Sequence, residues 1–239
     1  MPQFKTELLS VHHIADNTIE CLFQKPAEFT YQAGQFCTWV YENQPMNDKR
    51  GNRRVMSFAS SPTESELKIT MRVGPSAYKQ SLQHAPQGTP FSIIGPAGKF
   101  VLPTDTSKHI VFLAGGVGVT PFRSILKYVL DSKSSYAITM IYSNLCCKTA
   151  AYSDELGQYQ QEIPNFHFVP TMTSENPEHG WKGETRLINE SLLRETVKDI
   201  PNSIYMIVGP PGMVEAMITL LQSLNIPKEQ ILSEKFTGL

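Results

Sequence analysis

Two different rhythms of apolar and polar positions divide the chain. Over roughly the first hundred residues, short segments alternate or run apolar, and glycine and proline fall between or at the ends of them. The pattern predicts strands at Phe4–Val11, Thr18–Phe23, Gln35–Tyr41, Arg54–Ala59, Leu67–Val73 and Pro90–Gly95. Strands at this spacing indicate a small closed or nearly closed antiparallel barrel. A short helix is expected at Ser76–His84, with Ser76 as its N-cap.

From Lys108 onward, strands alternate with helices. The pattern predicts strands at His109–Ala114, Tyr136–Ser143, Asn165–Thr171, Ser203–Val208 and Gln230–Phe236, and helices after Thr120 and at Ala150–Glu162, Asn189–Val197 and Pro211–Asn225. This alternation predicts a Rossmann-like parallel sheet covered on both faces, with ligands outside the carboxyl ends of the strands. We therefore expect a barrel domain at residues 1–103 and a nucleotide-binding α/β domain at residues 104–239.

Composition excludes several classes of partner. The 239 residues carry a net charge of −1, with 41% hydrophobic and 18% charged residues, as in ordinary globular proteins. This balance gives no reason to expect binding to nucleic acid or to an anionic membrane. No apolar run approaches a membrane span, and the first residues lack the apolar core of a signal peptide, so we expect a cytoplasmic protein.

The four cysteines do not predict a metal site. Cys21, Cys37, Cys146 and Cys147 fit neither a zinc pattern nor the grouped spacing of an iron–sulfur loop. We expect free thiols in a reducing compartment. Any one-electron carrier must then be a separate protein.

A glycine turn lies at the start of the α/β half. The apolar strand from His109 leads into Gly115, Gly116 and Gly118, and then into Thr120 and the helix-starting Pro121. Glycines and a helix N-terminus let phosphates approach the backbone, so the turn is a candidate nucleotide site. The alternative is that these glycines serve tight packing only.

A second motif lies in the predicted barrel. It reads Arg-Val-Met-Ser-Phe-Ala-Ser-Ser-Pro from Arg54 to Pro62. Alone, it is also compatible with a strand that carries one exposed arginine and ends in a turn. Three further blocks accompany it, at Gly34–Phe36, Arg72–Lys79 and Gly95–Phe100.

These four blocks, in this order before Gly-Gly-x-Gly-x-Thr-Pro, resemble the flavin-binding barrel of the ferredoxin–NADP reductase family. Tyr142–Asn144, Val208–Met213 and Glu234–Leu239 resemble the family's later segments, so the resemblance covers nearly the whole chain. It is closest to the compact bacterial flavin-dependent reductases without an attached iron–sulfur domain. Met56 departs from the family, which usually has tyrosine or phenylalanine there.

The resemblance implies a bound FAD. Arg54, with Ser76 and Lys79 at the start of the short helix, would hold its pyrophosphate, for which a guanidinium fork is well shaped. Ser57 would place its hydroxyl near flavin N5, and Phe236 would cover the flavin face that nicotinamide must share. The FAD-binding residues implied are Arg54, Val55, Met56, Ser57, Arg72, Val73, Ser76, Lys79 and Phe236.

The resemblance also implies NADH or NADPH as substrate. The nicotinamide nucleotide would lie across Gly115, Gly116, Gly118 and Thr120, opposite Gly209 and Pro210. Ser57, Glu234 and Phe236 are the implied catalytic residues, although Glu234 is equally compatible with a solvated C-terminal carboxylate. The choice between NADH and NADPH stays open at this point.

The implied function is hydride transfer from NAD(P)H to FAD, followed by electron transfer to a separate acceptor such as ferredoxin, flavodoxin or an oxygenase component. One alternative is a reductase of small molecules, such as free flavin, ferric chelates or quinones. The other is a non-catalytic subunit that binds flavin or nucleotide.

Overall fold

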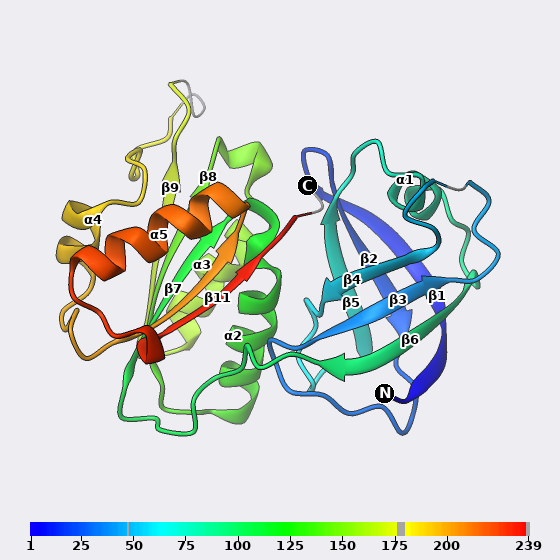
Figure 1. The fold of residues 1–239 in the computed structure, drawn as a ribbon, viewed down its shortest axis with the longest axis horizontal. Helices are drawn as coiled ribbons and strands as arrows, with labels where there is room; N and C mark the ends of the chain where they lie inside the picture. The colour runs from blue at the N-terminus through cyan, green and yellow to red at the C-terminus, as the bar shows by residue number, and fades with distance from the viewer. Residues whose placement is uncertain (47, 176–179, 238–239) are drawn as a thin grey trace.

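The computed structural model describes residues 1–46, 48–175 and 180–237, and the chain forms two sheets (Figure 1). The first consists of β1 (Gln3–Ala15), β2 (Thr18–Gln24), β3 (Phe36–Tyr41), β4 (Arg53–Ser57), β5 (Glu66–Arg72) and β6 (Pro90–Ala97). Their order is β4-β3-β6-β1-β2-β5, and all neighbours are antiparallel. The predicted six-stranded antiparallel architecture is confirmed.

The barrel curls around an aromatic core. Phe23, Trp39, Phe58 and Phe91 are fully buried, and the ring centroids of Phe23 and Trp39 lie 4.7 Å apart. β1 is longer than predicted because its first half pairs with β6 and its second half with β2. The sheet ends at β4 and β5, and these two edge strands border the candidate site.

The short helix α1 (Ala77–Gln83) follows β5. Ser76 occupies the N-cap position, as predicted, although its side chain makes no capping hydrogen bond. The carboxylate of Asp48 instead accepts a hydrogen bond of 2.9 Å from the Ala77 N–H. An acidic side chain from a distant loop therefore satisfies the start of α1.

The second sheet is parallel throughout. It contains β7 (His109–Gly115), β8 (Ala137–Asn144), β9 (Phe166–Met172), β10 (Ile204–Gly209) and β11 (Ile231–Lys235), in the order β11-β10-β7-β8-β9. Its helices are α2 (Thr120–Ser132), α3 (Ser153–Glu162), α4 (Glu190–Thr196) and α5 (Pro211–Ser223), with 3₁₀ turns at Gly116–Val119, Cys147–Thr149 and Lys228–Gln230. The predicted Rossmann-like sheet is confirmed.

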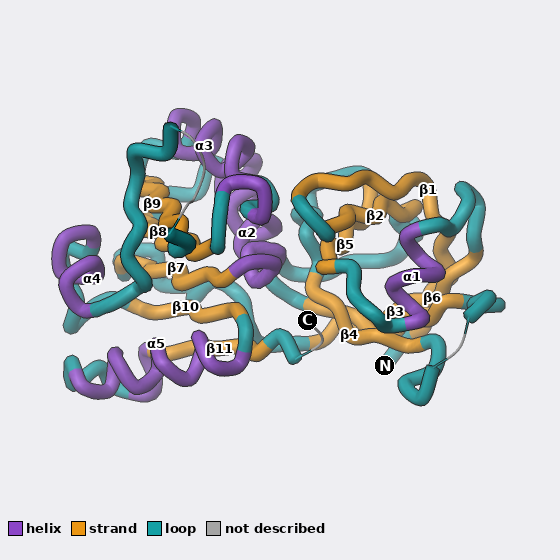
Figure 2. Tube along the Cα trace, turned by 90° about the horizontal axis from the view of Figure 1, so that it is seen from above, coloured by secondary structure: helices purple, strands orange, loops and turns teal. Residues whose placement is uncertain are grey.

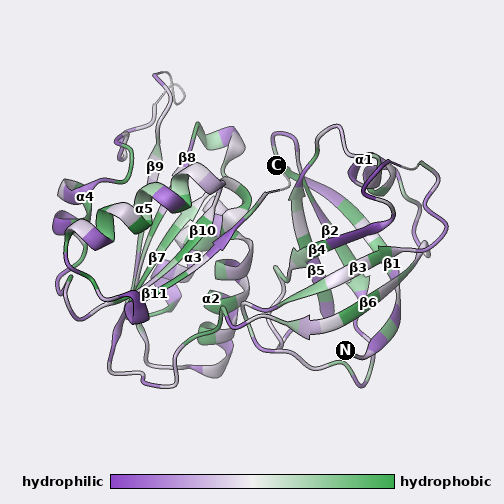
Figure 3. Cartoon of the chain, viewed as in Figure 1, coloured by the Kyte–Doolittle hydropathy of each residue, from purple (hydrophilic) through white to green (hydrophobic). Residues whose placement is uncertain are grey.

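Helices cover both faces of this sheet, as Figure 2 shows for α3 and α5. Alternate residues of β7 serve the two faces: Phe112 packs in the core beneath α2 and α3, whereas Val111 and Leu113 pack in the core beneath α4 and α5. A strand buried on both faces needs an uninterrupted apolar run, which explains the apolar sequence of β7. Figure 3 shows the apolar central strands of this sheet, whereas β4 of the barrel begins with Arg53 and Arg54 and continues with the apolar Val55 and Met56.

The chain's last described residues connect the two halves. After β11 the chain runs from the α/β half to the barrel half (Figure 1), and the Phe236 N–H donates a 3.0 Å hydrogen bond to the Gly209 carbonyl. Asn47, and Gly238 and Leu239 of the segment Glu234–Leu239 that contributes to the resemblance, lie outside the described residues. None of the helices in the described ranges is long and apolar enough to span a bilayer.

Candidate functional site

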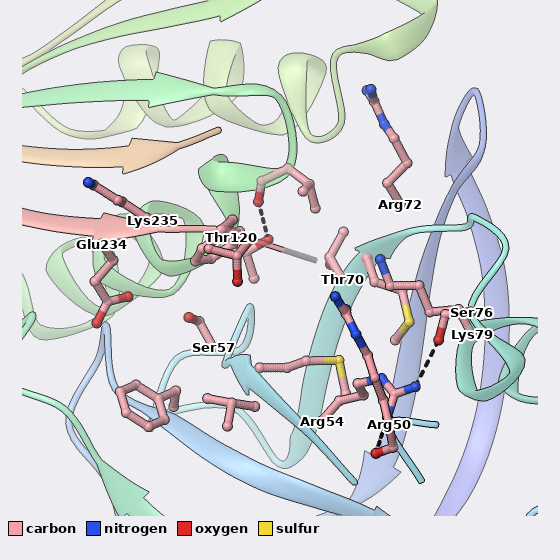
Figure 4. A pocket seen from close by; sticks show the side chains of 17 residues that line it. Arg50, Arg54, Ser57, Thr70, Arg72, Ser76, Lys79, Thr120, Glu234 and Lys235 are labelled. Atoms are coloured by element: carbon pink, nitrogen blue, oxygen red, sulfur yellow. Dashed lines mark hydrogen bonds between the residues drawn. The ribbon is translucent and has the colours of Figure 1, made fainter. Parts of the chain in front are cut away.

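A cavity of about 460 Å³ lies where the two halves meet (Figure 4). Its walls come from β3, β4, β5 and the start of α1 on the barrel side, and from the turn before α2 and the end of β11 on the other. The lining residues are Phe36, Arg50, Arg54, Val55, Met56, Ser57, Thr70, Met71, Arg72, Ser76, Lys79, Val117, Thr120, Glu234, Lys235, Phe236 and Thr237. This volume is typical of sites for small organic ligands.

Arg54 is held firmly at one end of the cavity. One terminal nitrogen donates to the carbonyls of Arg50, Gly51 and Arg53, and the other donates to Asp48 at 3.1 Å and to the Ser76 hydroxyl at 3.0 Å. The guanidinium also lies 5.0 Å from the ring centre of the buried Tyr78. These contacts place a planar cation with a fixed orientation beside the start of α1.

Further cations surround Arg54. Burial and the nearby charges of Arg54, Arg50 and Arg72 lower the pKa of Lys79 to about 8. The buried Nε of Arg72 has no hydrogen-bond partner among the described residues. This group of partly buried positive charges is complementary to an anion such as a diphosphate.

An acidic side chain marks the other end of the cavity. Burial raises the pKa of Glu234 to about 7, from an ordinary value of 4.5. Figure 4 shows Glu234 and Ser57 turned toward the same part of the cavity, away from Arg54 and Ser76. Ser57 is buried at the end of β4, where it pairs with Phe36 of β3. A carboxyl with a pKa near neutrality is able to exchange a proton there.

The glycine turn lies behind the wall of the cavity that the α/β half forms. The 3₁₀ turn Gly116–Val119 leads directly into α2, and Pro121 lies in its first turn as predicted. Val117 and Thr120 reach the cavity, and the Thr120 hydroxyl donates to the Val117 carbonyl at 2.7 Å. The Thr120 side chain therefore stands where α2 meets the barrel.

Close packing also explains why two of these positions are glycine. A Cβ atom on Gly118 would lie 2.4 Å from the Val208 carbonyl oxygen, and one on Gly115 would lie 2.2 Å from the Met213 sulfur and 3.1 Å from Pro210. Gly116 differs, because its φ of +52° requires the left-handed region while a Cβ atom there would touch little. The packing alternative thus applies to Gly115 and Gly118.

The structure brings together most of the residues predicted on the flavin side. Arg54, Val55, Met56, Ser57, Arg72, Ser76, Lys79, Glu234 and Phe236 all line the cavity, as does Thr120 from the nicotinamide side. Val73, Gly115, Gly116, Gly118, Gly209 and Pro210 are not among its lining residues.

Sequence reasoning missed Phe36, Arg50, Thr70, Met71, Val117, Lys235 and Thr237 as lining residues. Thr70 and Met71 directly precede Arg72 on β5, so the motif that begins at Arg72 was a local signal for them. Arg50 comes from a loop, and only the fold brings it to the cavity.

Comparison with known proteins finds similarity to oxidoreductases, in agreement with the nucleotide-binding half that the sequence predicts. Residues 112–218 match the family of the oxidoreductase NAD-binding domain. One subunit of the Na⁺-translocating NADH-quinone reductase of Methylococcus capsulatus is 34% identical over 155 residues, which are 63% of this chain and 38% of that protein. The chain therefore spans well under two thirds of the length of this relative.

Solved structures share the fold over almost the entire chain. A ferredoxin NADP⁺ reductase from Neisseria gonorrhoeae with bound FAD and NADP superposes with a TM-score of 0.80 at 22% identity, covering 98% of each chain. The cytochrome P450 reductase GcoB of Amycolatopsis gives a TM-score of 0.82 at 22% identity, covering 98% of this chain and 70% of that one.

Proposed function

We propose that the chain is a ferredoxin–NADP reductase-like oxidoreductase, which transfers hydride from NADH to FAD and passes the electrons to a separate acceptor. One observation carries this proposal: a single cavity has a cationic end on the barrel and Thr120 of the α/β half on its opposite wall. FAD bound by the barrel half and NADH bound by the α/β half would meet there.

We assign the proposed FAD site from the distribution of charge in the cavity, with the diphosphate at the cationic end. Arg54, Ser76 and Lys79 would bind the diphosphate, with Arg72 as a further cation, and Val55 and Met56 would contact the rest of the flavin. Val73 follows Arg72 but does not line the cavity, so a contact from it would need the flavin to extend beyond the lining residues. Ser57 and Glu234 would then lie at the reactive edge of the flavin, and Phe236 would cover its ring face. When bound, FAD supplies the hydride acceptor and the route to one-electron acceptors. The protein aligns the two rings and excludes water.

The coenzyme site is proposed at the carboxyl ends of β7 and β10. Gly115, Gly116, Gly118 and Thr120 form one wall, and Gly209 and Pro210 form the other, as expected for ligands of open parallel sheets. Ser143, Asn144 and Leu145 at the end of β8 carry neither a cation for a 2′-phosphate nor an acid for the ribose hydroxyls, so we choose NADH from similarity. The similar protein from Methylococcus capsulatus is a component of an NADH-quinone reductase.

The acceptor is proposed to be a separate molecule. Among the described residues, no group of three or more His, Cys, Asp or Glu side chains could hold a metal ion. We propose a one-electron carrier protein as acceptor and a cytoplasmic location for the exchange. The small-molecule reductase stays the alternative, and the two differ in whether turnover saturates with a protein acceptor.

The visible spectrum of the purified protein, followed by anaerobic addition of NADH or NADPH, tests the proposal. We expect a flavin spectrum that NADH bleaches faster than NADPH. Faster bleaching by NADPH would overturn the coenzyme choice. A flavin that neither coenzyme reduces would favour a non-catalytic binding subunit, and a protein that cannot be reconstituted with FAD would overturn the cofactor assignment.

A further inference from the structure

A buried arginine outside the cavity joins the two halves of the molecule. Arg123 lies on α2, one helical turn after Thr120, and only 4% of its surface is exposed. It donates to both carboxylate oxygens of Glu155 on α3, with the shortest contact at 2.7 Å, and to Glu64 of the barrel half. It also donates to the Ala59 carbonyl at 3.1 Å. These four residues are called the Arg123 clamp.

The clamp acts on the segment that directly follows Ser57. Ala59 comes two residues after Ser57, and the next residue, Ser60, accepts a 2.5 Å hydrogen bond at its carbonyl from the Ser124 hydroxyl of α2. Arg123 and Ser124, which are consecutive residues of α2, therefore donate hydrogen bonds to the consecutive carbonyls of Ala59 and Ser60. Thr120 and Ser57 line the cavity immediately beyond this contact.

The carboxylates of the clamp are themselves fixed. Glu64 accepts from the Ser61 N–H at 2.6 Å and pairs with Lys68 at 3.0 Å, and Glu155 accepts from the Tyr159 hydroxyl. Burial would lower the pKa of Arg123, but its hydrogen bonds to Glu155 and Glu64 raise it, so the guanidinium stays charged. A network with this many fixed partners admits one arrangement of its members.

Buried ion pairs are a poor way to gain stability, because apolar side chains of similar volume are often at least as stabilising. Their directional hydrogen bonds can instead specify one geometry. Hydride transfer requires such precision, since the reacting atoms must approach to about 3–3.5 Å and a displacement of about 1 Å can cost a hundredfold in rate.

We infer that Arg123 is a positioning residue for hydride transfer, which sets the distance between the nicotinamide wall at Thr120 and the flavin wall at Ser57. This inference rests on the proposed function. Arg123 reaches neither wall itself and acts through α2 and the Ala59–Ser60 carbonyls. A lysine at this position keeps the charge but lacks the planar fork that contacts Glu64, Glu155 and Ala59 together.

The test compares R123K with R186K in the FAD-reconstituted protein. Arg186 also pairs with two carboxylates, Glu184 and Glu195, but all three lie within the α/β half. Stopped-flow measurements give the rate of flavin reduction at saturating NADH and, separately, the rate at which ferricyanide reoxidises the reduced flavin. The second step does not need the two walls to be aligned.

For R123K we expect flavin reduction to slow by about tenfold or more, with FAD content and ferricyanide reoxidation unchanged, while R186K matches the wild type. Equal reduction rates in R123K and wild type would overturn the inference, as would an equal loss in both half-reactions. If R123K does not fold, S124A decides: slower reduction alone supports the inference, and an unchanged rate overturns it. A wild-type protein that NADH does not reduce would instead refute the proposed function.

Discussion

At the residue scale, Arg54 and Arg53 are neighbours on β4 with opposite surroundings. Arg54 lines the cavity and is only 12% exposed at its side chain, whereas Arg53 is exposed and is not a lining residue. R54A would remove the oriented cation from the proposed diphosphate site and weaken FAD binding by about tenfold to a hundredfold. R53A is the matched control, expected to keep its flavin. The flavin absorbance retained after gel filtration measures both, and equal retention would contradict the role of Arg54.

Glu234 is predicted to make stability depend on pH. Its folded-state pKa of about 7 lies above the ordinary 4.5, so the folded chain holds this proton more tightly than the unfolded chain. The contribution of this proton to the free energy of unfolding is fully present below pH 4.5 and is lost as the pH rises toward 7. E234Q, which cannot ionise, should match wild type at pH 4 and exceed it at pH 8 by about 2 kcal/mol after allowance for partial exposure.

Urea unfolding at both pH values, with FAD saturating throughout, measures this difference. The matched control is E162Q, which changes an exposed carboxyl at the end of α3 and should follow the wild-type pH dependence. Parallel pH profiles for E234Q and wild type would contradict a buried, proton-binding Glu234.

At the element scale, the strand–turn–helix unit makes a prediction about two glycines. The Cβ atom of G118A would meet the Val208 carbonyl at 2.4 Å, and backbone of a central strand cannot yield easily. We expect a loss of about 1–3 kcal/mol in the free energy of unfolding. A Cβ atom on Gly157 in α3 would have nothing within 4 Å, so G157A should gain about 0.5–1 kcal/mol. Denaturant titration of both variants checks the opposite signs, and a neutral G118A would contradict the packing argument.

The elements were largely predictable from local patterns. The apolar run of β7 and the Gly115–Pro121 turn specified a buried strand and a helix start. The match of residues 112–218 to the oxidoreductase NAD-binding domain agrees with the nucleotide-binding half that the motifs indicated. The role of Asp48 at α1 was not predictable, because the loop that carries it is distant in sequence. Arg123 was equally hidden, since a helical arginine near a turn is ordinarily exposed and only the packed halves supply Glu64 and Ala59.

At the scale of the whole molecule, polar contacts tie the two halves together. Besides the Arg123 clamp, the Tyr152 hydroxyl donates to Glu20 of β2 at 2.6 Å and contacts Thr70 of β5, and the Asp16 N–H donates to the Lys148 carbonyl at 2.7 Å. Apolar contacts cross between the halves as well, since Ala33 and Phe100 pack in the same buried core as Phe122 of α2, with the Phe100 and Phe122 ring centroids 5.6 Å apart. Interfaces with such polar contacts commonly join domains within one chain. The division of the chain at residues 103 and 104 stays a prediction.

This interface predicts that Tyr152 couples the unfolding of the two halves. Y152F removes hydrogen bonds that cross between them, whereas Y205F removes a 2.9 Å bond to the Ile200 carbonyl within the α/β half. Each change should cost about 1–2 kcal/mol. In calorimetry of the FAD-bound protein, Y205F should retain the wild-type ratio of calorimetric to van't Hoff enthalpy, while Y152F raises it because the halves separate before both have unfolded. An equal ratio in the two variants would mean that the Tyr152 contacts stabilise the chain without coupling its halves.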